Sequence, residues 1–168
     1  GGSLNLGGRS IVNLVTISGG TLTGGSFDAA KLTATGGTIS AVLTGTAGLT
    51  TGGNVALNAA NTFTGAVNVN AGTVTLGNAA ALGSSANAVN VAAGATVDLN
   101  GQSVTVAGLS GTGAVANTGA GSTLTLGGAT DATFAGAIGG ATALSKTGTG
   151  NQTLSAASTF TGGTTVTG

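Results

Sequence analysis

The amino-acid sequence predicts an all-β fold, a parallel β-helix (β-solenoid) in which short strands stack as successive coils of one chain. Three observations lead to this fold class. Apolar and polar residues alternate over stretches of four or five residues, glycine and asparagine separate these stretches, and similar units recur every 16 to 23 residues. We expect a single continuous solenoid over residues 1–168, without an internal domain boundary and as an excerpt of a longer repeat array.

The alternation predicts which side chains face the interior. Strand residues point alternately to opposite faces, and the threonine and valine content favours strands over helices. The predicted inward set is Val74, Leu76, Val97, Leu99, Val104, Val106, Leu124 and Leu126, and the predicted outward set is Thr73, Thr75, Thr96, Asp98, Thr105, Thr123 and Thr125. No segment shows a helical period. The alanine-rich residues 78–93, interrupted by Gly83 and Ser84, are predicted to be a turn or a lateral loop.

Three internal echoes give the coil length. The segment Gly19-Gly20-Thr21-Leu22-Thr23 recurs at residues 36–40 after 17 residues, and more loosely at residues 52–57 after a further 16. Residues 66–76 recur as residues 88–99, with an offset of 22 that grows to 23 through one inserted residue. Asn61-Thr62-Phe63-Thr64-Gly65 returns 97 residues later as residues 158–162. At about 20 residues per coil the chain makes roughly eight coils, a rod near ~40 Å long.

Glycine and asparagine are predicted to form the corners, because both tolerate the left-handed backbone of tight turns. The interior is expected to be narrow and filled by leucine, valine, isoleucine and alanine, with the four phenylalanines in the core or at coil corners (Phe27, Phe63, Phe134 and Phe160). An up-and-down barrel or a sandwich is the alternative, since both contain many short alternating strands. Against it, only Asn100-Gly101 could form a two-residue hairpin turn.

Composition excludes several classes of protein. The chain has 35 glycines but no proline, which excludes collagen, and it lacks histidine, cysteine, tyrosine and tryptophan. Most side chains used for nucleophilic, general-base or metal chemistry are therefore missing, and we expect no enzyme. The net charge is zero and no basic stripe exists, so we expect no nucleic-acid partner. The charged residues are Arg9, Lys31, Lys146, Asp28, Asp98 and Asp131.

No catalytic, cofactor-binding or metal-binding residue is predicted, and no cofactor is expected. Asp98 and Asp131 are the only carboxylates in the second half of the chain, and Asp98 is predicted to be a solvated surface residue. Calcium sites need more oxygen ligands than these two side chains supply. The glycine pairs are not followed by the residues of a phosphate-binding loop, so they are predicted to be turns.

Three segments resemble a known bacterial repeat. Residues 61–65, residues 69–76 and Lys146-Thr147-Gly148-Thr149-Gly150-Asn151-Gln152-Thr153-Leu154-Ser155 are similar to the autotransporter-associated β-strand repeat, over about residues 61–168. The resemblance implies a right-handed parallel β-helical passenger on the bacterial cell surface, exported by a C-terminal translocator barrel. It implies an extracellular segment that does not itself span a membrane and is anchored to the outer membrane through a region not present here. The repeat has no catalytic residues; Phe63 and Phe160 replace its usual tyrosine.

The resulting expectation is a structural, non-catalytic stalk that supports adhesion or surface display. Its expected partners are neighbouring coils or copies of itself, with a host-cell, glycan or matrix ligand that the sequence does not identify. One alternative is a subunit of a self-assembling extracellular filament or sheath, because charge is scarce and neither end has a charged cap. A minor alternative is ice binding, although the four Thr-x-Thr elements are unevenly spaced (residues 21–23, 33–35, 73–75 and 123–125).

Overall fold

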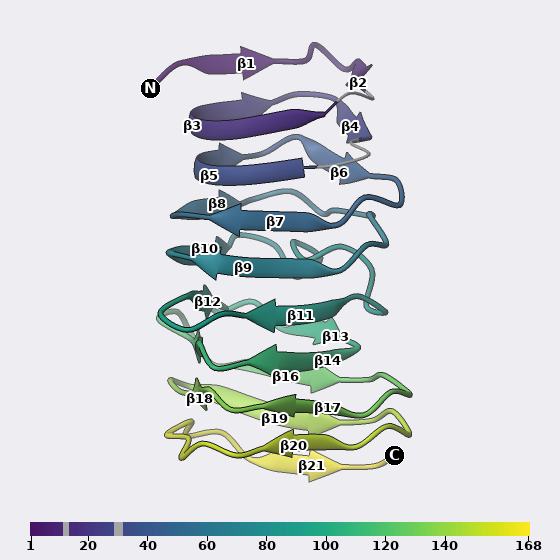
Figure 1. The fold of residues 1–168 in the computed structure, drawn as a ribbon, viewed down its shortest axis with the longest axis vertical. Coiled ribbons are helices and arrows are strands. Elements are labelled where there is room, and N and C mark those ends of the chain that lie inside the picture. Colours follow the sequence, from purple (N-terminus) through teal and green to yellow (C-terminus); the bar gives the residue numbers. More distant parts are fainter. Residues whose placement is uncertain (12–13, 29–31) are drawn as a thin grey trace.

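The computed structural model describes residues 1–11, 14–28 and 32–168, and within these ranges it is an all-β solenoid without a helix. Parallel strands stack into about eight turns. In Figure 1 the strands on the near side run to the left, the chain returns along the far side, and each turn lies below the previous one, which makes the solenoid right-handed. The described residues include no long apolar helix of the kind that crosses a membrane.

The coils have three faces, and the strands of each face pair in parallel register. The first face contains the beginnings of β3 (Val15–Thr23) and β5 (Leu32–Ile39), then β7 (Leu49–Gly52), β9 (Val67–Ala71), β11 (Ala88–Val91), β14 (Gly108–Gly111), β17 (Ala132–Phe134) and β20 (Gln152–Leu154). The second contains β1 (Ser3–Asn5), the ends of β3 and β5, then β8 (Val55–Leu57), β10 (Thr73–Leu76), β12 (Thr96–Asp98), β15 (Ala114–Ala116) and β18 (Ala137–Ile138).

The third face consists of two separate parallel sheets. The first has three strands, β2 (Ser10–Ile11), β4 (Ser26–Asp28) and β6 (Val42–Thr44), and the second has four, β13 (Val104–Val106), β16 (Ser122–Leu126), β19 (Thr142–Lys146) and β21 (Thr164–Val166). Every strand pair of the described residues is parallel, which excludes the alternative of an up-and-down barrel or an antiparallel sandwich.

The Gly-Gly-Thr echo corresponds to a sharp corner inside a long strand. β3 and β5 each pass from the first face to the second, and Thr21 pairs with Thr38, which confirms the offset of 17. Gly37 has φ +99°, and a Cβ there would collide with the carbonyl oxygen of Gly20. The third copy is displaced: Gly37 pairs with Val55, an offset of 18 instead of the predicted 16. The offset is still 17 between Ala34 and Thr51, so the corner between β7 and β8 holds one residue more than the corner within β5.

The longer echo is confirmed in detail. Asn68 pairs with Asn90, an offset of 22, and Thr73 pairs with Thr96, an offset of 23. The prediction of a turn or loop over residues 78–93 is wrong at its end, because β11 occupies residues 88–91. These four residues alternate like the strand that they pair with, whereas residues 78–87 do form turns and a loop.

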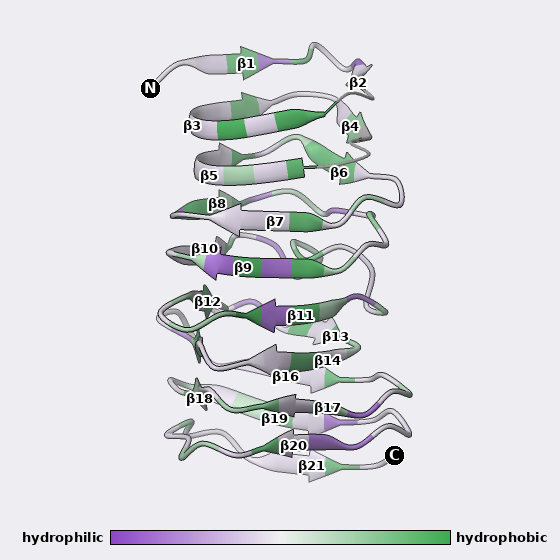
Figure 2. Cartoon of the chain, in the orientation of Figure 1, coloured by the Kyte–Doolittle hydropathy of each residue, from purple (hydrophilic) through white to green (hydrophobic). Residues whose placement is uncertain are grey.

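The core runs along the axis as columns of apolar side chains. One column places Leu22, Ile39, Leu57 and Leu76 on successive coils, and all four are buried. Figure 2 shows apolar and polar residues alternating along strands such as β3 and β9. The whole predicted inward set is buried, and of the phenylalanines three are fully buried while Phe160 packs partly buried against the core.

The echo of residues 61–65 reproduces a set of hydrogen bonds. Thr62 N donates to Leu43 O, and Thr159 N donates to Ile138 O, both at 2.8 Å. The side chain that precedes each threonine accepts from the coil before: Leu43 N donates to Asn61 Oδ1 at 2.9 Å, and Ile138 N donates to Ser158 Oγ at 3.1 Å. The five-residue motif is therefore a corner that ties one coil to the previous one.

Candidate functional site

The structure contains few side chains that could carry chemistry. Among the described residues, no group of three or more acidic, histidine or cysteine side chains is close enough to hold a metal ion. Lys31 lies outside the described residues. Arg9 is exposed near the start of the chain. The side chains with hydrogen bonds that could form a site are Asp98, Asp131 and Lys146, together with the asparagines that surround the coil corners.

Asp98 is buried, which corrects the prediction that it is a solvated surface residue. Only 7% of its surface is exposed, although it lies in the outward register position between Thr75 and Ala116. Its Oδ1 accepts from Asn100 N at 2.9 Å and from Thr118 N at 3.0 Å, and its Oδ2 accepts from Thr118 Oγ1 at 2.6 Å. The loops after β12 and β15 fold over the carboxylate, and sequence alternation alone does not reveal this cover.

The hydrogen bonds decide the charge state of Asp98. Burial alone would raise its pKa, but the Thr118 hydroxyl, the Thr118 N–H and the Asn100 N–H together hold the pKa below its ordinary value. A general acid or base at neutral pH needs a raised pKa and a free lone pair facing a substrate. Asp98 has neither feature, so its geometry fits a structural clamp between two coils.

A chain of asparagine side chains extends this clamp. Asn100 has φ +48° and donates from Nδ2 to Leu76 O at 3.1 Å. Asn117 Oδ1 accepts from Gly101 N at 2.8 Å, and Asn117 Nδ2 donates to Ser122 Oγ and to Ala141 O, both at 3.0 Å. These amides replace strand partners for backbone groups at corners, where the ladder of a solenoid is interrupted.

Asp131 and Lys146 make separate local contacts. Asn151 N donates to Asp131 Oδ1 at 2.7 Å, and this bond, with the Asn151 side chain, holds the pKa of Asp131 below its ordinary value. Lys146 Nζ donates to Gly148 O. Lys146 shares a register column with the buried Leu126. Neither residue is arranged with a second carboxylate or a nucleophile among the described residues.

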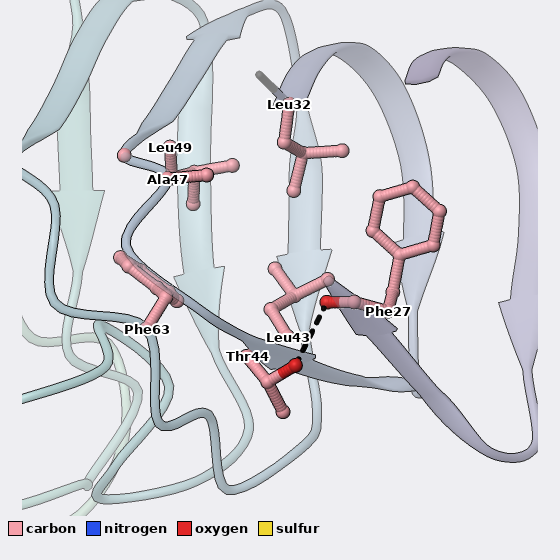
Figure 3. Close-up of a pocket in the computed structure, with 8 residues that line it drawn as sticks. Phe27, Leu32, Leu43, Thr44, Ala47, Leu49 and Phe63 are labelled. Atoms are coloured by element: carbon pink, nitrogen blue, oxygen red, sulfur yellow. Dashed lines mark hydrogen bonds between the residues drawn. The ribbon is translucent and has the colours of Figure 1, made fainter. Parts of the chain in front are cut away.

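An apolar void within the first coils is too small to hold a ligand. Figure 3 shows apolar side chains closing on a void of about 10 Å³ between Phe27, Leu43 and Phe63, where Thr44 Oγ1 donates to Phe27 O at 3.4 Å. That volume is at most the size of one water molecule. An open hollow of about 640 Å³ lies beside the interior of the last coil, between Leu144, Leu154 and Val166.

Two buried polar atoms were not anticipated from the sequence. Thr51 Oγ1 and Asn87 Oδ1 have no hydrogen-bond partner among the described residues. Thr51 occupies an inward column between Ala34 and Val69, where alternation alone could have marked it. Asn87 donates from Nδ2 to Phe63 O and Leu82 O, both at 3.0 Å, and so fastens the loop over residues 78–87.

The four Thr-x-Thr elements do not form one array. Thr33 pairs with Thr16 and Thr50, but Thr75 pairs with Ala56 and Asp98. In the four-stranded sheet of the third face, Thr123 pairs with Ala143. Thr21 and Thr75 share one column, but Ala56 interrupts it, and the other two elements lie on other faces. The structure therefore shows no regular threonine array and gives no support to the alternative of ice binding.

Part of this chain is similar in sequence to a known bacterial protein. The chain is 48% identical over 88 residues to the protein named "Adhesin BmaC autotransporter" of Brucella suis biovar 1 (strain 1330). It is similar to part of an autotransporter adhesin. The match covers 52% of this chain but 2% of that relative, so the chain spans a very small part of the adhesin. No protein-family model matches the chain, and no solved structure matches it.

The similarity confirms the resemblance to autotransporter passengers that the sequence motifs indicated. Right-handed parallel coils, which the repeat implied, are what the structure shows (Figure 1).

Proposed function

We propose that this chain is a structural segment of an autotransporter-like adhesin on a bacterial cell surface. The observation that carries the proposal is the 48% identity to an autotransporter adhesin in a chain that folds as a continuous parallel solenoid. The stacked coils form a stiff rod, because each coil is tied to the next by strand ladders on at least two faces and by a continuous apolar core. Such a rod extends and displays the parts of the parent protein that lie beyond it.

The geometry favours a mechanical role over catalysis. Asp98 is buried and accepts three hydrogen bonds, and Asp131 accepts from Asn151. Anchoring to the outer membrane through another part of the parent, and an extracellular location, belong to the same proposal and rest on the similarity to the adhesin.

The proposal is tested in the bacterium that makes the protein by deleting residues 1–168 in frame from the parent. We expect the parent to reach the surface, as measured with an antibody against its remaining part, and attachment to host cells to fall. A matched control replaces the segment with an unrelated solenoid of equal coil number. This replacement restores the length of the parent protein but not the specific contacts of the segment. Undiminished attachment of the deletion strain, with normal surface display, would remove the adhesive role and leave display alone.

The self-assembling filament stays an alternative prediction. The support for it is the scarcity of charge on the described surface, since charge is a common guard against association. Sedimentation of the purified chain over a hundredfold concentration range tests it: growth into long polymers supports the filament, and a constant monomer mass contradicts it.

A further inference from the structure

One face of the solenoid carries a continuous column of uncharged hydrogen-bonding side chains. Thr50 pairs with Asn68, Asn68 with Asn90, and Asn90 with Ser110, so that one such residue from β7, β9, β11 and β14 stands on each successive coil. Neighbouring strands lie about 4.8 Å apart, and the column therefore repeats at that spacing along the axis. Figure 2 shows the hydrophilic patches on β9 and β11 in the middle of this face.

A β-bulge adds a second amide beside the column. Between β7 and β9 the register shifts after Thr51, so that Gly52 pairs with Ala71 and Asn70 is left without a partner in the ladder. Asn70 and Ala71 are both exposed as a result. Bulges commonly re-aim a side chain at functional positions. We call Thr50, Asn68, Asn70, Asn90 and Ser110 the amide strip.

Two amides of the strip are free to bind a ligand. Asn90 Nδ2 donates to Ser110 Oγ at 3.0 Å, but the side chains of Asn68 and Asn70 make no hydrogen bond to the described residues. Small neighbours leave the amides of the strip accessible, because Ala66 precedes β9, Ala88 begins β11, and both are exposed. The corner asparagines differ, since Asn61 and Asn117 are buried and use their amides on the backbone.

The chemistry of the strip selects the class of ligand. The four strands that carry it contain no charged residue, so a polyanion finds no cation to pair with. They also offer no exposed aromatic or large apolar anchor of the kind that dominates protein–protein interfaces. A neutral, polyhydroxylated chain matches a row of amides and hydroxyls, and its sugar rings are comparable in length to the spacing of the coils.

We propose that the amide strip binds a neutral glycan chain lying along the solenoid axis, and that each coil supplies one hydrogen-bonding position of the strip. The inference rests on the proposed adhesive function and names its ligand class. Each side chain of the strip contributes one weak hydrogen bond, and the lack of aromatic stacking keeps the affinity of a single sugar low. The affinity of a ligand therefore increases with the number of coils that the ligand spans, as in other multivalent contacts.

The test is an NMR titration of the purified chain with neutral oligosaccharides of glucose, mannose, galactose and N-acetylglucosamine, each as a disaccharide and a hexasaccharide. A heparin hexasaccharide is the charged probe. We expect at least one neutral hexasaccharide to shift the side-chain amide signals of Asn68, Asn70 and Asn90, and to bind at least tenfold more tightly than its disaccharide. Asn68→Ala should lower that affinity at least fivefold, and Asn68→Thr, the residue type used at Thr50, serves as a second variant.

Asn58→Ala is the control, because Asn58 is an exposed asparagine that follows β8 on another face. Its affinity should equal that of the unchanged chain. The proposal is overturned if no neutral hexasaccharide shifts these amides, if heparin shifts them more strongly, or if the signals respond only to protein concentration, which would show that a second copy covers the strip. Because the test uses the isolated chain, its failure leaves the attachment result for the parent adhesin unaffected.

Discussion

The side chain of Gln152 pairs with the backbone of Leu109 across two coils. Leu109 N donates to Gln152 Oε1 and Gln152 Nε2 donates to Leu109 O, both at 2.9 Å. The strand between them, β17, meets β14 at a single register pair, Gly111 with Phe134. A glutamine side chain therefore completes the ladder at a position where the intervening strand does not.

Replacing Gln152 with alanine should destabilise the fold. The buried Leu109 backbone would lose partners for its N–H and its C=O, at a cost of about 1–3 kcal/mol per unsatisfied group. Urea unfolding measures the loss, and hydrogen exchange at the Leu109 amide should accelerate. The control is Thr153→Ala at the neighbouring exposed position. Equal stability of the two variants would show that the hydrogen bonds between Gln152 and Leu109 contribute nothing to the free energy of unfolding.

Leu124 tests the assignment of the inward face. It is 2% exposed and stacks between Val104 and Leu144. Leu124→Asp would bury an unpaired carboxylate and should cost about 3–5 kcal/mol in unfolding free energy. Thr125→Asp places the same charge on the outward side of the same strand and should cost far less. If thermal unfolding of the two variants coincides, the inward and outward faces are misassigned.

Asn61 tests the corner motif. Its amide accepts from Leu43 N and donates to Ala81 O, so Asn61→Ala leaves two backbone groups unpaired and should cost about 2 kcal/mol. Asn61→Ser should cost less, because Ser158 accepts the equivalent bond from Ile138 N in the later copy. Denaturant titrations of both variants measure the difference. A serine variant as unstable as the alanine variant would contradict the equivalence of the two corners.

Alanine substitutions at two glycines distinguish the cost of a left-handed backbone from the cost of a steric collision. Gly94 has φ +77° with open space where a Cβ would lie, whereas Gly111 has φ +97° and a Cβ there would collide with Val91 O. Gly94→Ala should therefore cost only the left-handed strain, about 1–2 kcal/mol. Gly111→Ala should cost clearly more, since β11 and β14 must separate. Thermal unfolding that ranks the two variants in the opposite order would refute the close stacking at Gly111.

Asp98 should make the free energy of unfolding depend on pH in the acid range. Because its hydrogen bonds hold the folded pKa below the ordinary value, the unfolded chain binds the proton more readily. The stabilisation is fully present above the unfolded pKa, about 3.9, and is lost as the pH falls through the lower folded pKa. Asp98→Asn should therefore flatten the decline in stability below about pH 4. An unchanged acid dependence in this variant would show that Asp98 does not contribute to it.

The sequence predicted the coils because each coil repeats the same physical pattern. Val74 and Leu76 alternate with threonines, and the Gly-Gly-Thr corners recur, so both the strand faces and the offsets of 17, 22 and 23 residues were readable before the structure. Strand β11 was partly missed for a related reason, since its residues were counted with the alanine-rich loop before them.

What the sequence did not predict are contacts between segments that do not follow the repeat. Asp98 occupies an outward position in the alternation, but a loop twenty residues later covers it through Thr118. Gln152 reaches Leu109 across 43 residues, and no local pattern indicates such a contact. The amide strip is intermediate, because its residues are visible in the sequence but their alignment depends on the register and on the bulge at Asn70.

The most direct test of the stacked coils is a disulfide between two engineered cysteines. The chain contains no cysteine, so no other thiol competes with the engineered pair. Thr105 and Thr125 are direct neighbours on β13 and β16. Their Cα atoms should lie ~4.8 Å apart, within the range that a disulfide needs. Thr105→Cys with Thr125→Cys should oxidise fully to an intramolecular disulfide, whereas Thr105→Cys with Thr123→Cys should not. Equal oxidation of both pairs, or of neither, would contradict the register on which the solenoid rests.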